Sequence, residues 1–298
     1  MDGMDGMDHM DGMDERGKVM RKQTGNRIPP EGGTPKQIFR LLVVGWLMVL
    51  AGGLALGAQP APAPHPLAGS RWTAADVDFM HPVYVNEFED VAALADWQLE
   101  GGLRMGVERG NLVLESQPGT TVSQANADHL VCWLRREMPA DFLFEFTVRP
   151  VNRAQGLNIV IFNARGIHGE EIFNPALAPR DGTFAQYHSG DLDNYHCSYW
   201  AGDRSTANLR KNKGFKLVAT GPDLVADAPP GGFQTIRVYK RGGTIRVTVD
   251  DVVSVAWDDD GKAFGPAITR PGWIGLRQMA HTVRCEYGRL RVYPIKGK

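Results

Sequence analysis

Cysteine is scarce in this chain, which has three cysteines among its 298 residues. Cys132, Cys197 and Cys285 form an odd-numbered set, and their spacing fits no metal site. Each lies in an apolar or aromatic run. We therefore expect three buried thiols that pack as small apolar side chains.

An excess of charge of either sign is also lacking, because the formal net charge is −1. A chain so near neutrality has no overall electrostatic attraction for a polyanion. We therefore expect no nucleic-acid partner.

Long apolar runs are rare as well, and the clearest one extends from Leu41 to Ala58. It is preceded by basic residues, namely Arg21, Lys22, Arg27, Lys36 and Arg40. Residues 20–58 are therefore typical of an export signal, and the apolar run is also near the minimum length of a membrane span. A cleaved signal peptide and an N-terminal anchor are the two alternatives. We expect an exported protein, periplasmic or extracellular, that meets a membrane only through this segment.

Two further segments lie outside the expected fold. Residues 1–19 begin with a Met-Asp-Gly repeat that has nothing to bury, which predicts a disordered extension, with Met20 as an alternative start. Residues 59–70 carry a Pro-Ala linker. The remaining residues, 71–298, suit one domain of the size that all-β sandwiches reach.

Helical periodicity is almost absent from these remaining residues. Short alternating segments follow one another instead, separated by Gly, Pro, Asn and Asp. In one of them Phe142, Phe144, Phe146 and Val148 share a face. About a dozen such segments predict an all-β fold, an antiparallel jelly-roll sandwich of two sheets packed face to face. A long loop at 164–183 interrupts the pattern, and loops of this length are often functional.

The segment from Phe184 to Phe215 combines aromatic and titratable side chains more densely than a core segment does. Flat rings beside hydrogen-bonding groups suit a sugar, which offers apolar C–H faces and a rim of hydroxyls. We therefore predict a site for a polysaccharide or oligosaccharide. The residues expected to bind it are Gln186, Tyr187, Asp191, His196, Tyr199, Trp200, Asn208, Lys211 and, from a later strand, Arg277.

Strand alternation divides these side chains between two faces. If 184–188 is a strand, Gln186 and His188 point one way and Tyr187 points the other. In the following segment His196 points away from Tyr195. One face of each strand must be core, so some of these rings pack in the interior rather than bind a ligand.

Three classes of function compete for this site. An eliminating lyase would use His188 or Tyr195 to move the C5 proton of a uronate, and Arg210 to neutralise its carboxylate. A glycoside hydrolase would need two carboxyl groups, for which Glu171 and an aspartate such as Asp191 are the candidates. A glycan-binding module would need no reacting group.

Metal ligands show no recognisable spacing. The motif His168-Gly169-Glu170-Glu171 does not have the spacing of a zinc helix. The run of three aspartates that ends at Gly261 leaves two alternatives, a structural calcium ion or a solvated turn. We expect no cofactor and no catalytic metal.

Six separated blocks resemble a known family, namely GLNIVIFNARG (156–166), GEEIFNPAL (169–177), QYHSGDLDNYHCSYW (186–200), NLRKNKGFKLVATGPD (208–223), WDDDGKAFGP (257–266) and GWIGLRQM (272–279). In this order they resemble the YesU-like family of domains of unknown function, within the concanavalin A-like lectin/glucanase superfamily. The resemblance implies a jelly roll with a concave, glycan-facing sheet. It also implies an association with plant or algal polysaccharide, notably pectin-type rhamnogalacturonan. It implies no settled reaction and no catalytic residues.

Overall fold

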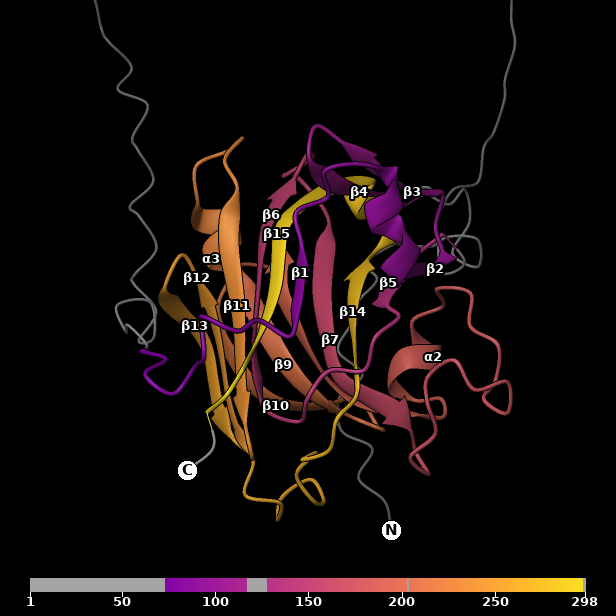
Figure 1. The fold of residues 1–298 in the computed structure, drawn as a ribbon, viewed down its shortest axis with the longest axis vertical. Helices are drawn as coiled ribbons and strands as arrows, with labels where there is room; N and C mark the ends of the chain where they lie inside the picture. The colour runs from indigo at the N-terminus through magenta and orange to yellow at the C-terminus, as the bar shows by residue number, and fades with distance from the viewer. Residues whose placement is uncertain (1–72, 117–127, 203, 297–298) are drawn as a thin grey trace, which may run out of the picture. The chain divides into compact units, whose positions relative to one another are not determined.

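The computed structural model describes residues 73–116, 128–202 and 204–296 of the chain (Figure 1). The chain divides after Gln59, and every described residue belongs to the second unit, which begins at Pro60. The expected extension at 1–19, the signal or anchor at 20–58 and the linker at 59–70 lie outside the described residues. Within the described ranges, no helix is both long enough and apolar enough to cross a bilayer.

Two antiparallel sheets make up the fold, which confirms the predicted all-β sandwich (Figure 1). The eight-stranded sheet contains β1 (Tyr84–Asn86), β3 (Arg104–Glu108), β4 (Asn111–Glu115), β6 (Phe142–Pro150), β11 (Gln234–Arg241), β12 (Thr244–Val249), β13 (Val252–Asp258) and β15 (Arg284–Pro294). The seven-stranded sheet contains β2 (Trp97–Gly101), β5 (Leu130–Leu134), β7 (Leu157–Gly166), β8 (Leu192–Ala201), β9 (Thr206–Asn212), β10 (Lys216–Pro222) and β14 (Trp273–Gln278). Within the described ranges, four short helical segments connect strands, namely η1 (Val91–Asp96), α2 (Ala185–His188), α3 (Leu224–Asp227) and η2 (Ala280–Thr282).

The main core lies between the two sheets and is built by strand alternation. Phe142, Phe144, Phe146 and Val148 of β6 all belong to it, as their shared face predicts. Burial of each such side chain stabilises the fold by about 1.5–3 kcal/mol. The seven-stranded sheet is therefore held with one face against the core and the other face outward.

The three cysteines are free and buried, which confirms the prediction for them. Burial raises the pKa of the Cys197 and Cys285 thiols to about 12, because a thiolate is poorly solvated there. Such thiols are inert as nucleophiles at neutral pH.

The segment at 184–188 forms a turn of helix, so the predicted strand there is wrong. In α2 the N–H of Ser189 donates to the carbonyl of Ala185, at 2.9 Å. Local hydrogen bonds of this kind satisfy the backbone, so the segment needs no partner strand. Consequently Gln186 and His188 do not share a strand face.

The predicted long loop lies between the end of β7 and α2, over residues 167–184. Ile172 and Leu177 of this loop are buried against the outer face of the seven-stranded sheet, in a second apolar cluster with Trp133 and Tyr187. Figure 1 shows the loop and α2 beside β7 and β14. The loop therefore covers one part of the sheet and borders the rest.

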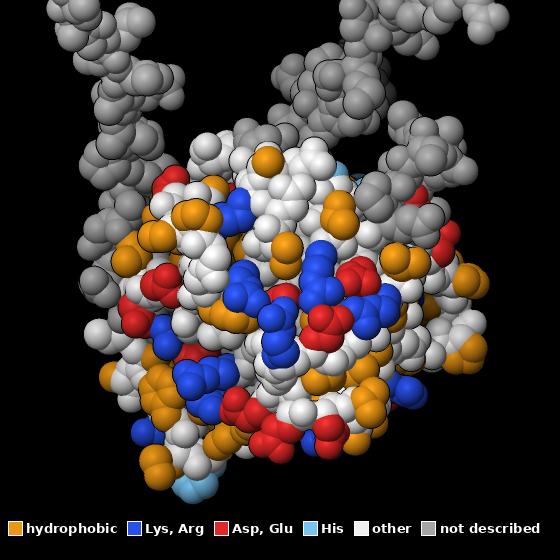
Figure 2. All heavy atoms as spheres, turned by 90° about the horizontal axis from the view of Figure 1, so that it is seen from above, with side chains coloured by type: hydrophobic (Ala, Val, Ile, Leu, Met, Phe, Trp, Pro, Cys, Tyr) orange, Lys and Arg blue, Asp and Glu red, His pale blue; other side chains and the backbone are white. Residues whose placement is uncertain are grey.

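Charged side chains of both signs are mixed on the surface. Figure 2 shows Lys and Arg side chains interspersed with Asp and Glu side chains on the face seen from above. Neither sign forms a broad uniform field in that view, which agrees with the near-zero net charge.

Candidate functional site

The outer face of the seven-stranded sheet brings together several residues predicted for the site. His196 in β8 pairs directly with Arg210 in β9, and Asn208 lies two residues before Arg210 on the same side. Arg277 in β14 lies on this face as well, since it pairs with the outward-facing Ile159 of β7. The register of the sheet, rather than any local motif, places these polar groups side by side.

Four rings form a tight cluster over this face. The ring of Phe184 lies 4.5 Å from that of His188, and His188 lies 4.3 Å from Phe215, measured between centroids. His196 lies 5.8 Å from Phe215 on the other side. The Arg210 guanidinium carbon stacks 3.8 Å from the Phe215 centroid. Phe215 therefore joins the α2 segment to the sheet and presents a ring next to a cation.

Arg277 is a fully buried cation that no described carboxylate neutralises. Its Nε and Nη1 atoms have no hydrogen-bond partner, and its Nη2 atom meets only the sulfur of Met279, at 3.6 Å. The guanidinium lies 4.6 Å from the ring of Phe184 and 5.0 Å from that of Tyr187. Burial lowers the pKa of Arg277 to about 10, so it stays charged at neutral pH. An unpaired buried charge is costly, and the N–H groups of these two unbonded nitrogens suit an anionic partner.

The neighbouring imidazoles are held in the neutral form. Burial, reinforced by Arg277, lowers the pKa of His188 to about 4 and that of His129 to about 3. Burial and Arg210 lower the pKa of His196 well below its usual value. The positive charge of this region at neutral pH therefore comes from its arginines, with the histidines acting as neutral hydrogen-bonding groups.

A chain of amides fixes His196 in one tautomer. The side chain of Asn212 donates to Nδ1 of His196 at 2.8 Å and to Oδ1 of Asn194 at 2.8 Å. Asn194 in turn donates to the backbone carbonyl of Tyr187, at 2.9 Å. Because Nδ1 of His196 accepts, its neutral ring carries the proton on Nε2. His196 is therefore a hydrogen-bond donor in this arrangement.

Glu100 of β2 anchors the loop to the sheet. Its carboxylate accepts hydrogen bonds from Arg180 at 2.8 Å, from the indole of Trp133 at 2.9 Å and from the hydroxyl of Tyr187 at 2.8 Å. Burial and the charge of Glu100 raise the pKa of Tyr187. The Tyr187 hydroxyl is thus committed to the structure, and its ring, rather than its hydroxyl, contributes to the site.

Two predicted site residues lie at a different place, on the core side. The Nζ atom of Lys211 lies 2.7 Å from Oδ2 of Asp259, and the hydroxyl of Tyr195 donates to the same oxygen at 2.5 Å. Asp259 is buried, so a solvated turn is wrong for this aspartate. Within the described ranges no group of three or more His, Cys, Asp or Glu side chains could hold a metal ion, and the calcium alternative stays a prediction.

Other predicted residues have structural roles. Tyr199 and Trp200 are buried in the core between the sheets. Gln186 accepts a hydrogen bond from the N–H of Asp181 at 3.0 Å, and Asp191 accepts one from the N–H of Ala178 at 2.8 Å. The last candidate, Glu171, is exposed on the loop.

The sequence does not predict a role for three residues of this region, namely Phe184 and Phe215 of the cluster and His129, whose pKa is lowered by burial and by Arg277. The two phenylalanines bounded the predicted segment, so their positions were available as a signal. His129 precedes β5 directly and accepts a hydrogen bond from the N–H of Ala280 at 2.7 Å. No local pattern marks His129, because its neighbours come from a distant part of the chain.

The side chains of the candidate site are better suited to binding a ligand than to transferring a proton. A base whose pKa is about 4, like that of His188, is neutral at pH 7 but only weakly basic. The phenols of Tyr187 and Tyr195 have raised pKa values and are engaged by Glu100 and Asp259. Cations, ring faces and neutral imidazoles together suit a ligand that is ring-shaped and anionic.

Comparison with known sequences identifies a relative. The "Uncharacterized protein YesU" of Bacillus subtilis (strain 168) is 32% identical over 209 residues, which cover 66% of this chain and 89% of that protein. A crystal structure described as a protein of unknown function with galectin-like fold, from Bacillus subtilis, has a TM-score of 0.66 at 29% identity. The match covers 74% of this chain and 100% of that one.

More distant structures share the fold. A variant of SCLam, a non-specific endo-beta-1,3(4)-glucanase from family GH16, has a TM-score of 0.50 at 16% identity, covering 75% of this chain and 97% of that one. At this identity the likeness concerns the fold alone. The family described as "Domain of unknown function (DUF1961)" matches residues 81–292, most of the chain. The chain therefore belongs to the DUF1961 family.

Proposed function

We propose that this protein is an exported carbohydrate-active protein that binds plant- or algal-type polysaccharide with uronate groups on the outer face of its seven-stranded sheet. One observation carries the proposal. Among the described residues, the Arg277 guanidinium is buried without a carboxylate partner, beside a cluster that includes Arg210 and the rings of Phe184 and Phe215. A uronate offers both an anion for the cations and an apolar sugar face for the rings.

The fold is compatible with this proposal. SCLam, which shares the fold, is a glucanase by its name, so a sandwich of this type can hold a polysaccharide. Its likeness to this chain does not extend to a reaction or to catalytic residues. The sugar class is therefore argued from the charges and rings of this chain's own site.

Export is the part of the proposal that rests on the sequence before residue 59. Fractionation of cells that express the full chain tests it, with periplasmic or extracellular recovery as the expected result. Recovery of the whole protein in the cytoplasm would contradict export and leave the binding proposal intact.

The decisive experiment measures glycan binding by the full chain. We expect binding to polygalacturonate or alginate and none to a neutral β-1,3-glucan, with affinity that falls as salt rises. Arg210→Met and Arg277→Met should each weaken binding roughly tenfold or more. The matched control is Arg237→Met, because Arg237 lies on the other sheet and pairs with Glu145. Equal affinity for neutral and acidic glycans, or no binding to any of them, would refute the proposal.

The same samples are assayed for the two catalytic alternatives, elimination and hydrolysis. An eliminating lyase would create a C=C bond and raise ultraviolet absorbance, and the weakly basic His188 argues for slow elimination at most. A hydrolase would release reducing ends and lose that activity in Glu171→Gln. We expect glycan binding without either signal. A rise in absorbance would instead indicate a lyase, and release of reducing ends would indicate a hydrolase.

A further inference from the structure

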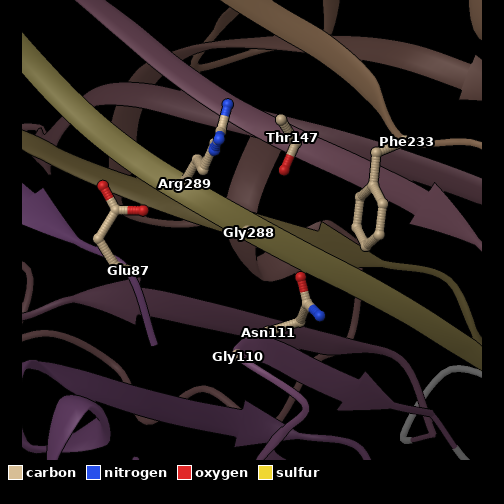
Figure 3. Close-up of a pocket in the computed structure, with 7 residues that line it drawn as sticks. All are labelled: Glu87, Gly110, Asn111, Thr147, Phe233, Gly288 and Arg289. Carbon is tan, nitrogen blue, oxygen red and sulfur yellow. The ribbon is translucent and has the colours of Figure 1, made fainter. Parts of the chain in front are cut away.

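A hollow lies on the opposite side of the sandwich from the candidate site, on the outer face of the eight-stranded sheet. Its volume is about 360 Å³, and its lining residues are Glu87, Gly110, Asn111, Thr147, Phe233, Gly288 and Arg289. Figure 3 shows Phe233 at one end, Glu87 and Arg289 at the other, and Thr147 and Asn111 on either side of β15. None of these residues belongs to the site on the seven-stranded sheet.

Gly288 shapes the floor of this groove. A Cβ atom placed there would lie 2.7 Å from Oδ1 of Asn111 and 3.1 Å from Oγ1 of Thr147. Without a side chain at 288, the two polar groups face a bare strip of backbone from both sides. The amide nitrogen of Asn111 donates to the carbonyl of Arg109 at 2.9 Å, so its orientation is fixed. The floor therefore offers one acceptor and one hydroxyl to a ligand.

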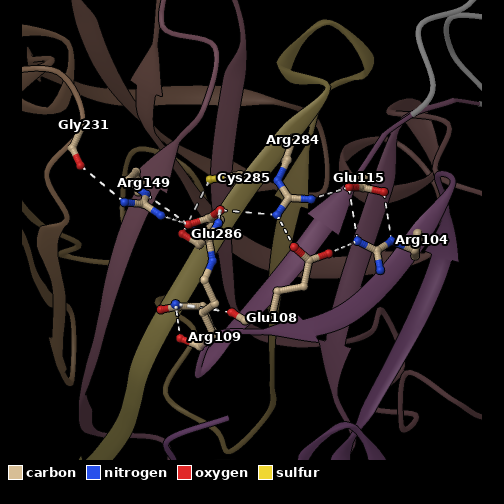
Figure 4. A network of polar contacts seen from close by, with 10 residues as sticks. Arg104, Glu108, Arg109, Glu115, Arg149, Gly231, Arg284, Cys285 and Glu286 are labelled. Carbon is tan, nitrogen blue, oxygen red and sulfur yellow. Dashed lines mark hydrogen bonds and ion pairs between the residues drawn. The ribbon is translucent and has the colours of Figure 1, made fainter. Parts of the chain in front are cut away.

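Phe233 supplies a fixed apolar wall. Its side chain is 37% exposed, and the Arg149 guanidinium stacks 4.6 Å from its ring centroid. Arg149 is itself held by Glu286 through its Nε atom, at 3.0 Å (Figure 4). The ring is therefore oriented by an ion-paired arginine and keeps exposed surface for a flat apolar partner.

Arg289 gives the groove a positive charge. Its side chain is exposed at a bulge of β15, where φ is +47°, and no described acid pairs with it. The groove's only acidic residue, Glu87, is already paired with Arg291 among the described residues. The free charge in the groove is therefore cationic.

We propose that this groove is a second glycan-binding site that takes one acidic sugar residue. The sugar's apolar face would pack on Phe233, its hydroxyls would bond Asn111 and Thr147, and Arg289 would meet its carboxylate or sulfate. The ligand class follows from these groups and does not depend on the proposed function of the other sheet. Because the two faces are opposite, one molecule then holds two separate glycan segments and bridges long chains.

Calorimetric titration of the full chain with a short oligogalacturonate tests the proposal. We expect two oligosaccharides per wild-type chain, and one per chain in Phe233→Ala and in Gly288→Ala. The second variant keeps the ring but fills the strip between Asn111 and Thr147. Phe79→Ala is the control, because Phe79 is also exposed but packs on Tyr293 away from the groove. It should still bind two.

The outcomes separate the two sites. One oligosaccharide per wild-type chain, lost in Arg277→Met and kept in Phe233→Ala, would overturn this second site and leave the proposed function standing. One oligosaccharide lost in Phe233→Ala and kept in Arg277→Met would support the groove and refute the proposed function. No binding at all, or binding only of a peptide, overturns the groove as a glycan site.

Discussion

The outer faces of the two sheets differ in how completely their buried and half-buried arginines are paired with carboxylates. On the eight-stranded sheet, arginines and glutamates form a matched network (Figure 4). Arg284 lies 2.7 Å from Glu108 and 2.5 Å from Glu115, and Arg104 lies 2.9 Å from Glu115. On the seven-stranded sheet, Arg277 is more deeply buried than any of these arginines, and no carboxylate in the described part of the chain pairs with it.

The pKa values show the same contrast. Hydrogen bonds from Arg284 and Arg104 lower the pKa of Glu108 to about 2, so its charge is favoured where it lies. On the other face, burial and Arg277 disfavour the charged form of His188. Exposed ion pairs of this kind are common and change the folding free energy little, whereas a buried cation without a partner destabilises the folded state. Such a cation is therefore better explained by a ligand than by stability.

The largest expected effect comes from Glu100, a buried acid on the seven-stranded face that accepts hydrogen bonds from Arg180, Trp133 and Tyr187. Glu100→Gln should lower the free energy of unfolding by about 3–5 kcal/mol, because it leaves the buried Arg180 without its partner. Glu145→Gln, the same change on the other sheet, should cost about 1 kcal/mol or less. Urea denaturation of both variants measures the difference. Equal losses would mean that the two faces hold their charges alike.

Arg277→Met should have a smaller effect of the opposite sign. Methionine fills much of the same space and removes an unpaired buried charge, so we expect a gain on the order of 1–3 kcal/mol. Part of the gain is offset by lost contacts with the rings of Phe184 and Tyr187. Arg237→Met, which breaks the pair with Glu145, should give a loss instead. Thermal and urea unfolding check the signs, and a destabilised Arg277→Met would make Arg277 a structural residue.

The fold could be predicted because its determinants are local. Period-two alternation identifies β6, whose alternate side chains share the core face. The turn between β3 and β4 is local as well, since it is made by Arg109 and Gly110, both with positive φ. Alternation also separated His196 from Tyr195. It did not say which of the two faces the core, because that depends on the position of the other sheet.

The site was less predictable because its contacts join distant parts of the chain. The sequence pattern predicts Lys211 and Tyr195 as site residues, yet both bond to Asp259 on the core side, 48 and 64 residues further along the chain. The pattern of 184–188 was too short to distinguish a strand from a helical turn. Arg277 lacks an acidic neighbour among the described residues because of which distant segments pack around it. A local sequence motif does not contain that information.

The smallest expected effect is the change that Arg277→Met makes to the pH dependence of stability, because the two faces lose stability in different pH ranges. The folded pKa values of His188 and His129, about 4 and about 3, lie below the unfolded value of about 6.5. As pH falls from about 6.5 to 4, the unfolded chain therefore binds protons that the folded chain refuses, and stability declines. On the other face, Glu108 has a folded pKa of about 2, so its contribution is lost only below about pH 4.5.

Comparing wild type with Arg277→Met isolates the first face. Asp223, whose pKa burial raises to about 6, adds stability as pH falls from 6 to about 4, but it does so equally in both proteins. The variant removes the charge that opposes protonation of the histidines, so its stability should decline less between pH 6.5 and 4.5. The two curves should run parallel only below about pH 3, where His188 and His129 are protonated in the folded state of both proteins. Urea midpoints measured across this range decide the matter. Parallel curves between pH 6.5 and about 3 as well would mean that Arg277 does not set the protonation of its neighbours, and the contrast between the faces would then reduce to burial alone.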